Sequence, residues 1–335
     1  MSLPFTTTAA TSPNIGESTL SGTREDIKRA IGRFLGISRD DTDWTAEQTQ
    51  DVADIIESGE RTFYLPVNHT WSFLRPEFSQ AINEPYGTGT IAATDGTVTL
   101  TTGTWPSWAA DGFLVVDGAG YKVDSRTSGS IIVLEDDSVT ITSGTSYSLE
   151  RWEYTLPDDF GGFLETWLSF VPENNKICPV RQTGIAEILQ LRAQNLGNVS
   201  TQPEVFAVQA KASDRTAGQR FKIFLYPVPQ QAGALVGRYY AVPWAISDAA
   251  PYPLGGQPHF ETLLEACLAA AELHMNDTLG VHTQKFQERL AASISHDRRM
   301  SPRHFGYNYD SRTQGISYRR VRGDLVTYDN LPLVS

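Results

Sequence analysis

Histidine is the side chain that most often binds metals or transfers protons near neutral pH, and the sequence holds 6 of them. They are His69, His259, His274, His282, His296 and His304. A zinc protease places two histidines on one helix face in the pattern His-Glu-x-x-His, and no such spacing occurs here. We therefore predict structural or solvated histidines and no metal site.

Carboxylate clusters and glycine-rich turns are further candidates for chemistry. Acidic residues gather within 40–43, 135–137 and 158–159, where pairs could hydrolyse glycosides or bind calcium. None of these clusters matches the Asp-x-Asp-x-Asp-Gly calcium loop. Gly87-Thr88-Gly89 and Gly118-Ala119-Gly120 lie between predicted strands and open no helix, so they do not form a phosphate loop. The pattern predicts no catalytic site and no cofactor.

The C-terminal segment 301–335 has few aliphatic side chains and interleaves arginines with tyrosines. The residues that we expect to bind a partner are Arg303, Tyr307, Tyr309, Arg312, Tyr318, Arg319, Arg320 and Arg322. Arginine and tyrosine can bind single-stranded nucleic acid, and both are also enriched at protein interfaces. Because the whole chain carries a net charge of -12, protein contact is the favoured interpretation.

The negative charge is concentrated in the first half of the chain. Residues 1–170 hold 10 Lys/Arg and 25 Asp/Glu, whereas residues 171–335 hold 17 and 14. Phosphate binding needs clustered cations, so the first half is not expected to bind nucleic acid. Cys178 and Cys267 are predicted to be free thiols in a reducing compartment.

Helical patterns occupy both ends of the sequence. Thr23 is a predicted cap for a helix that ends at Gly36, and Thr45 with Gln48 forms a predicted capping box for a second helix that ends before Pro66. A short helix is expected around 185–191. The widest apolar stripe predicts a buried helix, and a shorter stripe predicts its partner in an αα-hairpin. These stripes consist of Phe260, Leu263, Leu264, Cys267, Leu268, Ala271, Met275 and Leu279, and of Phe286, Leu290 and Ile294.

The segment 87–156 changes to short β-branched runs. Asp95-Gly96 and Asp117-Gly118 separate consecutive runs, and both dipeptides favour tight hairpin turns. We therefore predict a small antiparallel barrel or sandwich of short strands. Further strands are expected at 205–209, 220–226 and 234–242, the last two paired as a hairpin across a proline-rich loop.

Together these patterns predict an α+β fold, a helical bundle interrupted by a β-module and flanked by extended arms. The expected parts are an N-terminal arm at 1–22, a helical domain at 23–86 and 157–300 with a β-hairpin at 203–243, an inserted antiparallel β-domain at 87–156, and a C-terminal arm at 301–335.

Three segments resemble virion proteins of tailed bacteriophages. They are Tyr154-Thr155-Leu156-Pro157-Asp158-Asp159-Phe160, Phe224-Leu225-Tyr226-Pro227-Val228-Pro229 and Gly237-Arg238-Tyr239-Tyr240-Ala241-Val242-Pro243. The chain is most similar to head-to-tail adaptor (connector) proteins of the tail tubular and portal-adaptor type, with a layout that covers most of 23–300. The matching positions are Leu156, Pro157, Asp159, Phe160, Tyr226, Pro227, Tyr239 and Tyr240. We interpret them as structural positions that fix turns and strand ends.

The resemblance implies a non-enzymatic virion protein, assembled in the host cytoplasm, that forms a dodecameric ring at the head-tail junction. Its expected partners are the portal protein and tail or nozzle proteins, with DNA passing through the ring without sequence-specific binding and with no membrane contact. The C-terminal arm is then expected to bind the portal or an adjacent copy. Another tail ring component, namely a hub, a stopper or a fibre-attachment ring, is the first alternative. A carbohydrate-binding virion protein that uses Trp105 and Trp108 as stacking platforms is the second.

Overall fold

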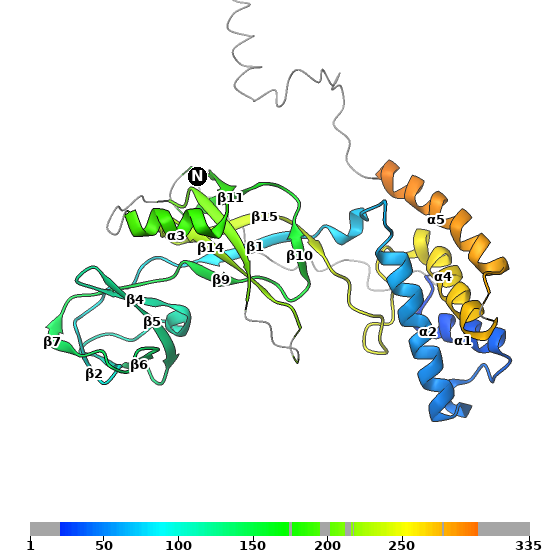
Figure 1. Cartoon of the computed structure of the whole chain (residues 1–335), viewed down its shortest axis with the longest axis horizontal. Coiled ribbons are helices and arrows are strands. Elements are labelled where there is room, and N and C mark those ends of the chain that lie inside the picture. Colours follow the sequence, from blue (N-terminus) through cyan, green and yellow to red (C-terminus); the bar gives the residue numbers. More distant parts are fainter. Residues whose placement is uncertain are drawn as a thin grey trace, which may run out of the picture.

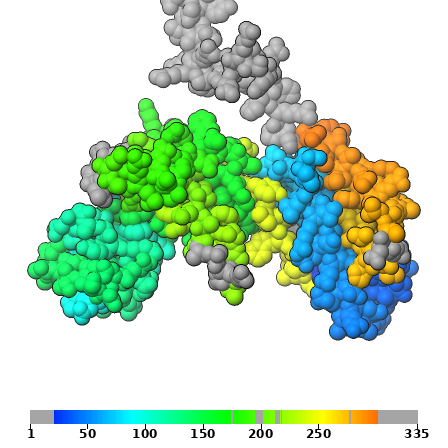
Figure 2. Space-filling model, in the orientation of Figure 1, coloured from blue at the N-terminus to red at the C-terminus, as the bar shows by residue number. Residues whose placement is uncertain are grey.

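The computed structural model describes residues 21–173, 176–194, 202–211, 216, 218–276 and 278–300. Three units lie side by side, with a seven-stranded sheet at one end, an eight-stranded sheet in the middle and the long helices at the other end (Figure 1). The same units form distinct lobes in the space-filling view (Figure 2). Each unit has its own cluster of buried apolar side chains. The predicted C-terminal binding set lies outside the described residues.

Four helices build the helical unit, and their ends follow from local capping. They are α1 (Arg24–Leu35), α2 (Ala46–Tyr64), α4 (Gln257–Asn276) and α5 (Val281–Met300). Thr23 and Thr45 cap α1 and α2 through reciprocal capping boxes, and Gly36 ends α1 in the left-handed conformation at φ 73°. The predicted starts of these two helices are therefore confirmed. No described helix is long and apolar enough to cross a membrane.

Helix α4 is the centre of this unit, since α1, α2 and α5 all pack against it. Its apolar side chains from Phe260 to Ala271 are buried or half-buried in the shared core, as the stripe predicted. The predicted burial is wrong at the far end, where Met275 is 54% and Leu279 is 76% exposed. These two residues lie at the tip of the αα-hairpin, where α4 ends and α5 begins.

The seven-stranded sheet is the predicted β-module. Its strands are β2 (Ile91–Thr94), β3 (Thr97–Leu100), β4 (Phe113–Val116), β5 (Ala119–Arg126), β6 (Ile131–Leu134), β7 (Ile141–Thr145) and β8 (Ser148–Glu150). The spatial order is β7-β2-β3-β6-β5-β4-β8. Because β7 and β8 follow each other in the chain yet form opposite edges, the sheet must curl until its edges meet, as in a barrel. Both predicted turns are confirmed by positive φ values, 48° at Asp95 and 49° at Asp117.

The central eight-stranded sheet is larger than the sequence patterns indicated. Its strands are β1 (Glu77–Ile82), β9 (Glu153–Thr155), β10 (Phe160–Phe163), β11 (Trp167–Pro172), β12 (Cys178–Gln182), β13 (Val205–Ala210), β14 (Phe221–Tyr226) and β15 (Gly233–Ala241). The order is β1-β15-β11-β12-β13-β14-β9, with β10 also paired to β15. Helix α3 (Ile185–Gln194) covers one face, where Ile188 packs with Val205 and Ala207. The opposite face forms a separate core around Phe206.

The structure corrects four details of the predicted layout. The segments 221–226 and 233–241 do not form a hairpin, because β14 pairs with β13 and β9 whereas β15 pairs with β1, β10 and β11. The strands β1 and β10–β12 were not predicted. Within 87–156, strand β9 pairs with the central sheet and not with the β-module. Buried residues of 205–241 join the core of this sheet, so they do not extend the helical bundle.

Candidate functional site at the junction of helices and central sheet

Four of the residues that carry the phage-protein resemblance meet at the edge of the central sheet nearest the helices. Leu156, Phe160 and Tyr239 are buried in one cluster, and the rings of Phe160 and Tyr239 stack with centroids 5.8 Å apart. The Tyr239 hydroxyl donates to Asp159 Oδ1 at 3.0 Å. Burial, and then this hydrogen bond, raise the pKa of Tyr239 to about 12, so the hydroxyl stays a donor at neutral pH.

The other matching positions lie around this cluster or on the opposite side of the sheet. Pro157 lies between Leu156 and Asp159, and the Phe160 N–H donates to its carbonyl at 3.0 Å. Tyr240 points to the helical core, so it links the sheet to the helices. Tyr226 and Pro227, joined by a cis peptide bond, lie near α3, where the Tyr226 hydroxyl donates to the Leu191 carbonyl at 3.4 Å.

Two segments connect the helices with the central sheet. The first connector comprises residues 65–76 between α2 and β1, and the second connector comprises residues 242–256 between β15 and α4. Backbone hydrogen bonds fix both at the sheet edge, since Val242 N donates to the Asp159 carbonyl at 2.7 Å and Tyr239 N donates to the Pro76 carbonyl at 3.3 Å. The motif cluster therefore lies where both connectors leave the sheet.

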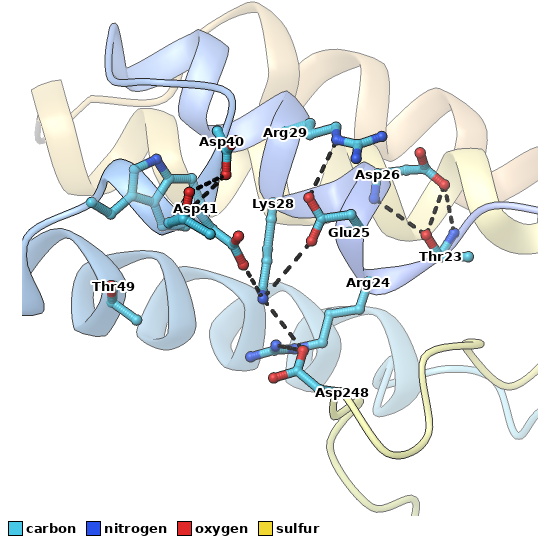
Figure 3. A network of polar contacts seen from close by, with 12 residues as sticks. Thr23, Arg24, Glu25, Asp26, Lys28, Arg29, Asp40, Asp41, Thr49 and Asp248 are labelled. Atoms are coloured by element: carbon cyan, nitrogen blue, oxygen red, sulfur yellow. Dashed lines mark hydrogen bonds and ion pairs between the residues drawn. The ribbon is translucent and has the colours of Figure 1, made fainter.

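Charged side chains attach the second connector to α1 (Figure 3). Arg24 pairs with Asp248, and Lys28 Nζ reaches Asp248 at 3.3 Å and Asp41 at 2.7 Å. Burial lowers the pKa of Lys28, but the hydrogen bonds to the two carboxylates outweigh it and raise the pKa above its ordinary value. The Arg24 backbone N–H adds a bond to the Pro251 carbonyl at 2.8 Å, which fixes the connector against the helix.

Helix α2 supplies a second set of anchors to the same connector. Both Glu60 carboxylate oxygens accept the Ile246 N–H, at 3.1 and 3.2 Å. The Tyr64 hydroxyl donates to the Leu254 carbonyl at 3.3 Å. Burial raises the pKa of Glu60 to about 7, so this carboxylate is a buried titratable group close to neutral pH.

A buried carboxylate attaches the first connector to α5. Asp297 accepts the Ser72 backbone N–H at 3.2 Å and lies 2.8 Å from His69 Nε2. Burial raises the pKa of Asp297, but the hydrogen bonds from Ser72 and His69 outweigh it and hold the pKa below its usual value. His259 packs against Trp71 in the same region, with ring centroids 5.1 Å apart. His69 and His259 thus take part in hydrogen bonding and ring packing at the first connector.

The anchored connectors present large apolar side chains to solvent. Trp244 is 68% exposed, and we define the junction patch as Leu65, Val242, Trp244, Tyr252 and Leu254, all of which are exposed. Two neighbouring grooves of about 200 and 280 Å³ share Tyr64, Val242 and Trp244 among their lining residues. An apolar patch that is held in place and rimmed by polar residues is typical of a surface that contacts another protein.

An open cleft lies on the first-connector side of the junction. Its volume is about 790 Å³, and it is lined by residues 65–70, Arg75, 161–164 and Tyr240. Val67 is 98% exposed at this cleft. Within the described residues no group of three or more His, Cys, Asp or Glu side chains is placed to hold a metal ion. The lining of the cleft combines apolar side chains with polar ones, among them Asn68, His69 and Arg75.

The structure exposes different tryptophans from those that the sequence suggested. The sequence suggested Trp105 and Trp108 as possible sugar platforms, but Trp105 is 1% exposed and lies inside the β-module core, with Trp108 packed against that core. Trp105 cannot stack on a ligand from there. The junction patch was not predicted, because a tryptophan between two alanine- and proline-rich turns has no periodic pattern that reveals its exposure. Its position between two prolines, Pro243 and Pro251, after the end of a predicted strand was the available signal.

Comparison with known protein families extends this picture. A family model described as SU10 adaptor protein matches residues 23–306, which include all three units and the junction between them. No curated protein matches the sequence.

Proposed function

We propose, because this chain belongs to the SU10 adaptor protein family of phage structural proteins, that it forms a closed ring at the head-to-tail junction of the virion. The observation that carries the proposal is the length of the match, residues 23–306, which includes both the helical unit and the β-module. The ring is dodecameric by resemblance. One end of each copy docks on the portal, and the other end meets tail or nozzle proteins.

The arrangement of the units supports this role. The helical unit and the β-module lie at opposite ends of the molecule, so each can contact a different partner (Figure 1). The junction patch adds an exposed apolar surface between them, as expected of a chain that works in contact with others. DNA passes through the ring without sequence-specific binding, consistent with the net negative charge of residues 1–170.

The proposed ring is tested by the mass of the assembled protein. Purified full-length chain is examined by light scattering coupled to size exclusion, first alone and then after mixing with portal particles. We expect a closed ring, either spontaneously or on the portal, and electron microscopy of the same fractions shows its symmetry. A chain that stays monomeric in both conditions contradicts the proposal.

The C-terminal arm is proposed to bind the portal or an adjacent copy through Arg319, Arg320 and Arg322. Deletion of 301–335 should abolish docking on portal particles, because clustered arginines supply charge-assisted contacts, and should leave the thermal melt nearly unchanged. The melt is recorded by circular dichroism and docking by co-sedimentation. A melt that collapses on deletion would instead show that the arm belongs to the folded unit. A triple substitution of these arginines with alanine separates the charge from the length of the arm.

A further inference from the structure

Helix α2 exposes an acidic face. We define the acidic edge as Glu47, Asp51, Asp54 and Glu57, all solvent-exposed, which follow one side of α2 at spacings of three and four residues. Glu57 pairs with Arg61 on the same helix, which is the cation of this face. Among the described residues no cation lies within ion-pair distance of Glu47, Asp51 or Asp54. The charge of this edge is therefore largely uncompensated within one copy.

Helix α5 exposes positively charged side chains. We define the basic edge as Lys285, Arg298 and Arg299, all exposed and without an ion-pair partner in the described part of the chain. Arg289 on the same helix is already paired with Glu261 of α4, and Glu288 is the acid of this face. Between Lys285 and Arg298 the exposed residues include three small ones, Ala291, Ala292 and Ser295. Small side chains allow another helix to approach closely.

The two edges lie on different sides of one rigid group of helices. Both α2 and α5 pack against α4, whose residues from Thr262 to Glu272 are buried or half-buried. Figure 2 shows α2 in blue and α5 in orange on different sides of the helical lobe. One copy therefore carries two separate surfaces of opposite charge, each facing solvent.

We propose that the acidic edge of one copy packs against the basic edge of the next copy around the ring, an inference that rests on the proposed ring function. A ring with cyclic symmetry needs a heterologous interface, in which two different surfaces of the same chain complement each other. A two-fold dimer through either edge alone would place like charges together, which is unfavourable. Charge complementarity thus favours a heterologous contact between neighbouring copies over a two-fold dimer.

The experiment uses charge reversal in the full-length chain. The first variant combines Asp51→Lys with Asp54→Lys, which places two cations at the centre of the acidic edge. The second combines Lys285→Glu with Arg299→Glu, so that both edges are acidic. We expect each variant alone to form at least about tenfold less ring than the wild type by mass photometry, because like charges then meet at every interface.

Mixing the two variants provides the decisive measurement. In a 1:1 mixture, the basic α2 face of the first variant meets the acidic α5 face of the second, and the unchanged edges also complement each other. We therefore expect alternating rings to form in the mixture at a yield close to that of the wild type. A matched control, Asp124→Lys with Asp137→Lys, makes the same change in charge at exposed sites of the β-module and should leave ring formation unchanged.

The outcomes distinguish this inference from the function on which it rests. Rings that form equally well with either variant alone would overturn the edge interface and leave the ring function standing. Variants that fail alone and are not restored by mixing would also overturn it. If the second variant still forms rings but loses binding to duplex DNA, the basic edge serves nucleic acid and the inference is wrong. A wild-type chain that never assembles, alone or with portal particles, overturns both.

Discussion

At the scale of single residues, Glu60 is a buried carboxylate that anchors the second connector. It is 4% exposed and accepts the Ile246 N–H, yet burial raises its pKa from an ordinary 4.5 to about 7. The nearby Arg24 acts in the opposite direction, and Glu57 in the same direction. Because the folded pKa lies above the unfolded one, this group stabilises the fold less as the pH rises from about 4.5 to 7.

The first prediction follows from the direction of this pH dependence. Glu60→Gln keeps an oxygen that can accept the Ile246 N–H and removes the charge. We expect the variant to exceed the wild type in free energy of unfolding by about 3 kcal/mol near pH 8 and by much less near pH 5, since the pKa shift from 4.5 to about 7 corresponds to about 1.4 kcal/mol per unit. Urea denaturation at both pH values measures the difference. Glu77→Gln, at an exposed position of β1, serves as control, and an equal change at both pH values would contradict the prediction.

At the scale of elements, the helical unit depends on how closely α2 approaches α4. A Cβ added at Gly59 would lie 2.6 Å from Cys267 Sγ and 2.7 Å from Cys267 Cα. No rotamer change can relieve a clash with backbone, so a glycine is needed at this crossing. The fully buried Cys267 is explained by the same contact, as a small apolar side chain beneath a close approach.

The second prediction concerns this crossing. Gly59→Ala should lower the free energy of unfolding by about 1–3 kcal/mol, because overpacking outweighs the better helix propensity of alanine. Ser58→Ala, at the exposed neighbouring position, should change it by no more than about 0.5 kcal/mol. Guanidinium unfolding followed by tryptophan fluorescence compares the two variants. A stabilised Gly59→Ala variant would show that the helices can separate here without cost.

The strands show which parts of the fold follow from sequence. The turns at Asp95-Gly96 and Asp117-Gly118 were predicted because the left-handed conformation is a property of the residues themselves. The pairing of β14 was predicted wrongly because nothing near the proline-rich loop specifies a partner. Strand β15 pairs with β1, with Gly237 opposite Phe78, so residues far apart in the chain decide its place.

At the scale of the whole molecule, three units are joined through a junction that carries the exposed apolar patch. The connectors are held by Glu60, Asp297 and the Arg24–Asp248 pair, so the patch is presented on a fixed frame. Large aromatic side chains on fixed frames lose little conformational freedom when they bind, and they dominate many interfaces. The patch should therefore matter for assembly rather than for folding.

The third prediction tests whether the junction patch serves assembly and not folding. Trp244→Ala should leave the melting temperature within about 2 °C, since the side chain is 68% exposed, and should weaken ring formation or portal docking at least about tenfold. Mass photometry and co-sedimentation with portal particles measure the two steps. Trp167→Ala, 61% exposed on β11 and outside the patch, is the matched control. If Trp244→Ala changes neither step, the junction patch is not an assembly surface.

The sequence alone determined the local structure, namely the caps at Thr23 and Thr45, the stop at Gly36 and the tight turns of the β-module. These depend on backbone preferences and hydrogen bonds within a few residues, which a sequence displays directly. Only the tertiary structure decided which strands share the central sheet, that Trp105 is buried and that Trp244 is exposed. Exposure and strand pairing depend on residues that are distant in the chain, and no local preference encodes them.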